Sequence, residues 1–299
     1  MNEPLVHGPD VPQAGHFQLL FDPGTVLAAV VGHRRRFRDS VGSLTDEELA
    51  SASRCEGWTV ADVLRHGIWV DGTFRRIWSG EGSTLKGFDP RTTPNEFVES
   101  NRAVPDAEIR RRYLSSTEDM VIELESAQSE RFGDPSVTPA GPVPWWLSVV
   151  HLGWDSTVHE RDALSPLGHK VEANPAETLP FLAYCLVLSS FFAGPDPLDV
   201  RVADIRLQRG TGPVTAWAIT TAAEADDERL SDPTSAVLTG EPTDIIDALS
   251  GRAPLTDVLN GQPAVIERLG GLATYFTSSN STPPSSSADT NPAPQNNVP

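Results

Sequence analysis

Residues 143–164, VPWWLSVVHLGWDSTVHERDAL, decide the fold of this chain. Their apolar residues recur at helical spacing, and His151, Asp155 and His159 follow one another at intervals of four residues. Positions four apart lie one above the other on a helix with about 3.6 residues per turn. Asp155 and His159 therefore present a carboxylate and an imidazole side by side, as a helix does when it supplies two metal ligands inside a bundle. The alternative is an amphipathic helix whose solvent face carries these polar residues.

His151 competes with His159 as the partner of Asp155. Two histidines eight residues apart on a helix are separated by about 12 Å, which is too far for one ion. Spacing therefore leaves either 151/155 or 155/159 as the pair. His66, within a second predicted helix at 59–78, is a candidate third ligand, although a lone histidine on an apolar helix is more often a packed core residue. Two imidazoles and one carboxylate would leave open positions on a divalent ion.

Composition excludes several classes of function. The 299 residues are 38% hydrophobic and carry a formal charge of −18, which disfavours binding to nucleic acid or to anionic membranes. The two cysteines, Cys55 and Cys185, form no CxxC motif and cannot make a disulfide framework, so we expect a cytoplasmic protein. The N-terminus lacks the features of a signal peptide. The apolar run at 179–193 is shorter than the roughly 20 residues of a membrane span and predicts a buried helix. The sequence leaves monomer and homodimer open.

The pattern along the chain predicts the α+β class. Residues 1–16 are expected to be disordered, and residues 17–172 to form a helical bundle. Its four helices are predicted at 22–38, 59–78, 105–126 and 143–164, with a short helical turn at 44–50. An irregular link at 80–104 makes this a four-helix bundle with a crossover connection. Residues 173–276 are expected to form a linking helix and a small α+β domain. That part contains a helix at 175–193, a hairpin of strands near 200–207 and 214–221, a strand at 235–239, and helices at 242–249 and 263–275. Residues 277–299 form a polar tail of the kind that does not order itself.

Two segments resemble motifs of the mycothiol-dependent maleylpyruvate isomerase family, which belongs to the DinB-like superfamily. Residues 55–66, CEGWTVADVLRH, are similar to its CPGWTVRDVLAHL signature, and residues 154–164, WDSTVHERDAL, resemble its E-xxx-H-xx-D motif. The resemblance covers roughly residues 22–276 and aligns His66, Asp155 and His159 with the family's metal ligands, which favours the 155/159 pair. It aligns Asp162 with the trailing aspartate, which we expect to orient His159 or to cap the helix end rather than to bind the metal. Residues 240–269 are similar to the family's C-terminal domain, which is related to sterol-carrier folds.

The resemblance implies a divalent metal, with Zn²⁺ as the expected ion, and a small thiol such as mycothiol at its open position. The implied activity is isomerisation or transfer on a small electrophilic substrate bound in a cleft between the domains. Arg252, in the place of the family's C-terminal arginine, is expected to bind a substrate carboxylate, with an ordinary surface arginine as the alternative. The alternative function is a non-catalytic ligand-binding or regulatory protein in which the metal is structural or absent.

Two departures and two further interpretations complete the prediction. Asp155 replaces the family's glutamate and is one methylene shorter, and many family members have no known reaction. Cys55 has no histidine or lysine near it in the sequence, so we do not expect it to be a nucleophile. The tryptophans of both motif regions are interpreted as core residues or pocket walls: Trp58, Trp145, Trp146 and Trp154.

Overall fold

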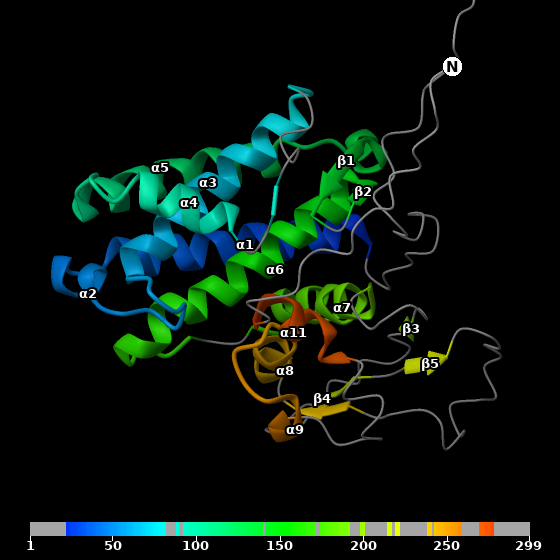
Figure 1. Ribbon diagram of the computed structural model, residues 1–299. Coiled ribbons are helices and arrows are strands. Elements are labelled where there is room, and N and C mark those ends of the chain that lie inside the picture. Colours follow the sequence, from blue (N-terminus) through cyan, green and yellow to red (C-terminus); the bar gives the residue numbers. More distant parts are fainter. Residues whose placement is uncertain are drawn as a thin grey trace, which may run out of the picture.

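The structure is a computed structural model, and it describes residues 22–81, 88–89, 92–139, 141–171, 174–191, 198–200, 214–216, 219–221, 238–240, 242–258 and 269–277. Over these residues the chain is mostly helical, with three antiparallel pairs of short strands (Figure 1). This composition is consistent with the α+β class. The predicted disordered segment 1–16 and all but the first residue of the predicted tail lie outside the described residues.

Four long helices pack together: α1 (Pro23–Gly42), α3 (Val60–Trp78), α5 (Asp106–Glu125) and α6 (Trp145–Leu164). Helices α1 and α3 each contact both α5 and α6, so the four enclose a common interior. Buried apolar side chains from all of them fill it, among them Val30, Leu64, Met120 and Leu152. Figure 1 shows α6 between α3 and α7 (Pro175–Phe191), and it contacts both.

Helix α6 is buried on nearly every side, since sixteen of its twenty residues are buried. The predicted alternative, an amphipathic helix with one solvent face, is therefore wrong for this segment. Its polar residues are enclosed by α1, α3 and α7 instead. Burying a polar side chain without a partner is costly, so the partners of the polar residues of α6 indicate what each of them does.

The predicted helix starts are confirmed. Asp22 caps α1 by accepting a hydrogen bond from the backbone N–H of Thr25 at 3.0 Å, and Pro23 occupies the first helical position. Thr59 and Asp62 form a reciprocal capping box at the start of α3, with bonds of 3.2 and 3.0 Å. These caps fix where α3 begins, and so which face of α3 carries His66.

A buried ion pair sets the register of the four helices. Arg34 of α1 is 2% exposed and donates to Asp71 of α3 at 2.5 Å. The same guanidinium lies 3.4 Å from the hydroxyls of Thr117 on α5 and Ser156 on α6. One side chain therefore contacts all four helices. Because Ser156 follows Asp155, this contact holds α6 in place opposite the His66 turn of α3.

Two segments predicted to be irregular contain regular structure. The link at 80–104 includes helix α4 (Thr93–Ser100), which packs on α3. It is only eight residues long and buries Val98 alone, so it has almost no apolar periodicity. The loop before α6 contains a 3₁₀ turn, η2 (Ser129–Gly133), and a hairpin of β1 (Pro135–Thr138) and β2 (Gly141–Pro144). Proline is rare inside strands, so the prolines in both segments argued against predicting this hairpin from the sequence. A five-residue helix, α2 (Asp46–Ala50), matches its prediction.

The C-terminal part carries α7, short strands and short helices. Helix α7 is buried as predicted, with Phe181 and Leu182 fully enclosed. Strand β3 (Leu198–Val200) pairs antiparallel with β5 (Ile219–Thr221), and β4 (Val214–Ala216) with β6 (Leu238–Gly240). The antiparallel direction matches the predicted hairpin, but the strand predicted at 214–221 is divided between two partners. The predicted turn at 212–213 lies outside the described residues.

Helix α8 (Pro242–Leu249) has its predicted bounds and packs on α7, and it is followed by α9 (Leu255–Val258), which was not predicted. Helix α11 (Gly271–Thr277) occupies the end of the predicted helix 263–275, whose earlier residues to 268 lie outside the described part. None of the helices in the described residues combines the length and the apolar character needed to cross a bilayer.

Candidate metal centre

Three side chains from α3 and α6 converge on one point. Asp155 Oδ1 lies 3.6 Å from His66 Nε2 and 3.7 Å from His159 Nε2, and one ligand atom of each residue lies within 4.8 Å of the others. These separations exceed a hydrogen bond, which has a donor–acceptor distance of about 2.7–3.2 Å. Two ligands on a tetrahedral ion with bonds of about 2.0–2.1 Å are roughly 3.3 Å apart. The spacing therefore resembles ligands around an ion more closely than hydrogen-bonded partners, and the short Asp155 side chain reaches the point between both rings.

His66 is buried without a hydrogen-bond partner. Its side chain is 7% exposed, and neither Nδ1 nor Nε2 has a hydrogen-bond partner among the described residues, the nearest carboxylate oxygen of Asp155 lying 3.6 Å from Nε2. Leaving a buried polar group unpaired costs about 1–3 kcal/mol. Burial lowers the pKa of His66, although the nearby Asp155 carboxylate opposes this shift. The neutral imidazole is the form that binds metals, so the lowered pKa and the two ring nitrogens without hydrogen bonds both suit a metal ligand.

Asp162 orients His159. Its Oδ2 lies 3.0 Å from His159 Nδ1, and a carboxylate can only accept, so Nδ1 donates and Nε2 faces Asp155. Burial disfavours an imidazolium, but Asp155 and Asp162 outweigh burial and raise the pKa of His159 to about 10. Burial likewise opposes ionisation of Asp155, yet His159 and His66 hold the pKa of Asp155 below its usual value. At neutral pH the two carboxylates therefore favour the imidazolium form of His159, and a metal ion bound here would have to displace its Nε2 proton.

Arg252 lies at the edge of the centre, beside α6. It follows Gly251, whose φ of +77° places it in the left-handed region of a tight turn. Arg252 Nη2 donates to Asp162 at 2.7 Å, Nε also donates to Asp162, and Nη1 donates to the Ser250 carbonyl. The arginine predicted to bind a substrate carboxylate thus has a carboxylate of the protein as its partner.

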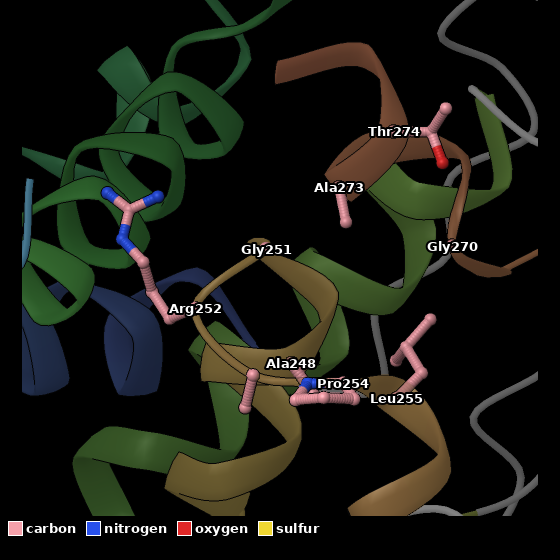
Figure 2. A pocket seen from close by; sticks show the side chains of 9 residues that line it. Ala248, Gly251, Arg252, Pro254, Leu255, Gly270, Ala273 and Thr274 are labelled. Atoms are coloured by element: carbon pink, nitrogen blue, oxygen red, sulfur yellow. The ribbon is translucent and has the colours of Figure 1, made fainter. Parts of the chain in front are cut away.

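A pocket of about 470 Å³ lies beside Arg252 but does not include the convergent ligands. Figure 2 shows the Arg252 side chain extending away from Pro254 and Leu255, which line the pocket. The pocket walls come from the end of α8, the following turn, α9 and the start of α11. The pocket and the convergent ligands are therefore adjacent features, with the guanidinium of Arg252 lying toward the ligands.

Cys55 has neighbours that its sequence context does not reveal. Its Sγ lies 3.9 Å from His159 Nδ1 and 3.7 Å from Arg252 Nη2, and it donates to Asp162 Oδ2 at 3.1 Å. The sequence around Cys55 contains no nearby histidine or lysine, but the fold brings a histidine and an arginine close to this thiol. The contacts come from α6 and from the turn after α8, which are far from Cys55 in the chain. The thiol serves as one more donor to Asp162.

His151 does not join the centre. Its Nδ1 lies 2.6 Å from the hydroxyl of Tyr184 on α7, and burial lowers the pKa of His151 to about 4. The two α6 residues that lie next to His66 are therefore Asp155 and His159, and not His151 and Asp155. Both pairs have the same spacing of four residues, so only the packing of α6 between α3 and α7 separates them.

A second polar cluster has the residue types of a nucleophilic triad but the wrong proton arrangement. His33 Nε2 lies 3.0 Å from Ser156 Oγ, and His33 Nδ1 lies 3.5 Å from Glu160. However, Arg36 Nη2 lies 3.0 Å from His33 Nδ1 and can only donate. His33 Nδ1 is therefore an acceptor, Nε2 carries the proton, and the ring cannot take a proton from Ser156 as a general base does. All three members of the cluster are buried, so we assign it a structural role.

Sequence reasoning missed the ion pairs that join α8 to the metal-ligand helix. Arg54 donates to Asp247 of α8 at 2.8 Å and to Asp162 at 3.1 Å. Arg161, next to Asp162, donates to Asp247 at 2.8 Å. Arg54 and Asp247 are 193 positions apart. No local pattern links residues at that separation.

The fold and the convergent side chains define a mostly helical protein whose central helices bring two histidines and an aspartate to one point. Residues 32–164 match the family model described as the mycothiol maleylpyruvate isomerase N-terminal domain. This segment is therefore similar to that domain, in agreement with the resemblance that the sequence motifs carry.

Solved structures agree on the fold. The chain is similar to the crystal structure of the mycothiol-dependent maleylpyruvate isomerase, with a TM-score of 0.56 and 13% identity over 82% of this chain and 94% of that chain. A structure of a mutant of that isomerase, with one histidine replaced by alanine, gives a TM-score of 0.54 at the same identity and coverage. At this identity the likeness concerns the fold alone. No curated protein matches the sequence.

Proposed function

We propose that this protein is a metal-dependent enzyme that uses a small thiol of the mycothiol kind to isomerise a small electrophile or to transfer the thiol to it. The match of residues 32–164 to the family model supports the thiol chemistry. The observation that carries the metal is the convergence of ligand atoms from His66, Asp155 and His159, together with two His66 ring nitrogens that have no hydrogen-bond partner among the described residues. Two imidazoles and a carboxylate suit Zn²⁺ and leave a position open.

The residues divide into ligands and supports. His66, Asp155 and His159 would hold the ion, and an ion there would favour the thiolate form of the thiol by lowering its pKa. Asp162 fixes the tautomer of His159, and Arg252 in turn fixes Asp162. Partners of this kind around ligating histidines commonly change metal affinity by about 10–100-fold. Arg252 reaches the ligands only through Asp162, so we propose that it acts by positioning and binds a substrate carboxylate only if it leaves Asp162.

We also propose the finer architecture. Residues 17–172 would form a DinB-like four-helix bundle with a crossover, supported by the mutual contacts of α1, α3, α5 and α6. Residues 173–276 would form a linking helix and a sterol-carrier-like α+β domain, supported by the antiparallel strand pairs and by α8.

Cobalt titration tests the proposal. Co²⁺ added to the full chain should bind at one ion per chain and develop visible absorption, and added mycothiol should then produce a thiolate-to-cobalt charge-transfer band. His159→Ala and His66→Ala should abolish both signals. His169→Ala is the matched control, because His169 is 36% exposed and pairs with Glu48 away from the centre. The metal content of the wild type and of His159→Ala is also measured after purification without chelators. If both proteins lack stoichiometric divalent metal, the enzyme proposal fails. Cobalt binding without any response to thiol would favour the non-catalytic alternative.

A further inference from the structure

We infer that the electrophile taken by this site is an uncharged, planar aromatic or conjugated molecule. This inference rests on the proposed function and deepens it. Two independent features of the described residues carry it: a wall of aromatic rings against the ligand histidines, and the absence of surplus positive charge among the arginines beside them.

The aromatic wall consists of Trp58, Trp69, Phe88 and Phe97. Trp58 stacks on the His159 ring at a centroid distance of 6.4 Å and lies 5.6 Å from the His66 ring. Trp69 lies 5.8 Å from the same His66 ring. The wall therefore begins at two of the ligands.

The wall continues away from the ligands and is only partly covered. Phe88 stacks on Trp69 at 5.7 Å with an interplanar angle of 18°, and Phe97 of α4 lies 6.1 Å from Trp69. Each of the four rings is half-buried rather than enclosed. Trp58 is held in place by a 2.7 Å hydrogen bond from Nε1 to Asn95, at the start of α4. A fixed, half-buried row of rings offers stacking and edge contacts to a planar guest.

Charge at the site balances without an anionic reactant. A divalent ion, the Asp155 carboxylate and a thiolate sum to zero. The arginines around Asp162 are matched one to one by carboxylates at ion-pair distance: Arg252 with Asp162 at 2.7 Å, Arg54 with Asp247 at 2.8 Å, and Arg161 with Asp244 at 3.2 Å. An anionic reactant would therefore have to displace a carboxylate of the protein. The formal charge of −18 further disfavours its approach.

The test is equilibrium dialysis of the zinc-loaded full chain with two unreactive probes of the same ring, 1,3-dinitrobenzene and 3,5-dinitrobenzoate. The uncharged probe should bind about tenfold more tightly than the anionic one. Trp69→Leu should weaken it by about five- to tenfold, and Trp69→Phe, which keeps a ring, should retain most of the affinity, as expected for one stacking contact. Trp146→Leu is the matched control, because Trp146, like Trp69, is a half-buried tryptophan packed on the core, but it lies near the start of α6, nine positions before Asp155.

The outcomes separate this inference from the proposed function. Equal or tighter binding of 3,5-dinitrobenzoate, no binding of 1,3-dinitrobenzene, or no effect of Trp69→Leu beyond that of Trp146→Leu would each overturn the inference. Zinc content is measured independently on the same samples. A chain that holds no zinc but binds 1,3-dinitrobenzene at Trp69 refutes the metal proposal and leaves the aromatic wall as the ligand site. A chain that holds zinc but binds 3,5-dinitrobenzoate more tightly than 1,3-dinitrobenzene refutes this inference and leaves the metal proposal standing.

Discussion

Replacing Asp162 by asparagine should weaken metal binding more than it weakens the fold. Asp162 has no exposed surface and accepts from His159 Nδ1 at 3.0 Å and from Arg252 Nη2 at 2.7 Å. Asparagine keeps the side-chain shape and one acceptor oxygen but removes the negative charge. His159 then loses the anion that raises its basicity, and the positive charge of Arg252 is left unmatched near the ion.

The expected loss follows from these contacts. Partners of metal-bound histidines typically contribute about 10–100-fold in affinity, which is about 1.4–2.8 kcal/mol. We expect the upper half of that range for Asp162→Asn, because the substitution removes the orienting acceptor and also leaves a neighbouring cation unpaired. The sign is fixed, since both changes make the site less favourable for a divalent cation.

Competition with a chromophoric zinc chelator at fixed pH and ionic strength measures this effect, and urea unfolding of the metal-free proteins reports the fold separately. Asp247→Asn is the matched control. Asp247 is a buried carboxylate with two arginine partners, Arg54 and Arg161, and neither of them is a ligand candidate. Its zinc affinity should stay within about twofold of the wild type, well under one tenfold step. Wild-type zinc affinity in Asp162→Asn, or an equal loss in both variants, would refute the reasoning.

Three further predictions concern the framework. Asp71→Ala should destabilise the protein by about 3–5 kcal/mol in urea unfolding by stranding Arg34, whereas the double change Arg34→Met with Asp71→Leu should restore most of that stability; equal losses in both would contradict a buried ion pair. Gly153→Ala should cost about 1–2 kcal/mol, because the new Cβ would lie 2.2 Å from Phe181 Cε1 and this overpacking exceeds the gain in helix propensity; a raised melting temperature would contradict it. His151 has a pKa lowered from 6.5 to about 4 in the folded state, so its contribution to stability is full above pH 6.5 and is lost as the pH falls toward 4. Between pH 6.5 and 4, the free energy of unfolding measured in urea should fall by up to about 3 kcal/mol more in the wild type than in His151→Asn. An equal fall in the two proteins would exclude His151 as the cause.

Local rules account for what the sequence shows about the elements. Helical periodicity, the Asp22 cap and the Thr59–Asp62 capping box act over four residues or fewer, so α1, α3 and α6 are readable from the chain alone. The same rules fail for α4 and for the β1–β2 hairpin. Helix α4 is short and polar, and the hairpin strands contain prolines, so neither segment shows a clear helical or strand periodicity in the sequence.

The motifs at 55–66 and 154–164 carried the family resemblance, and that resemblance favoured Asp155 and His159 with His66 as ligand candidates. Spacing alone could not choose between the pairs, because His151–Asp155 and Asp155–His159 are both four residues apart. Tertiary packing places Asp155 and His159 opposite His66, with α6 between α3 and α7. It also decided the contacts of Asp162 with Arg252 and of Arg54 with Asp247, over 90 and 193 positions. Such contacts depend on how whole helices pack, whereas a sequence pattern reports only the few residues that share a turn.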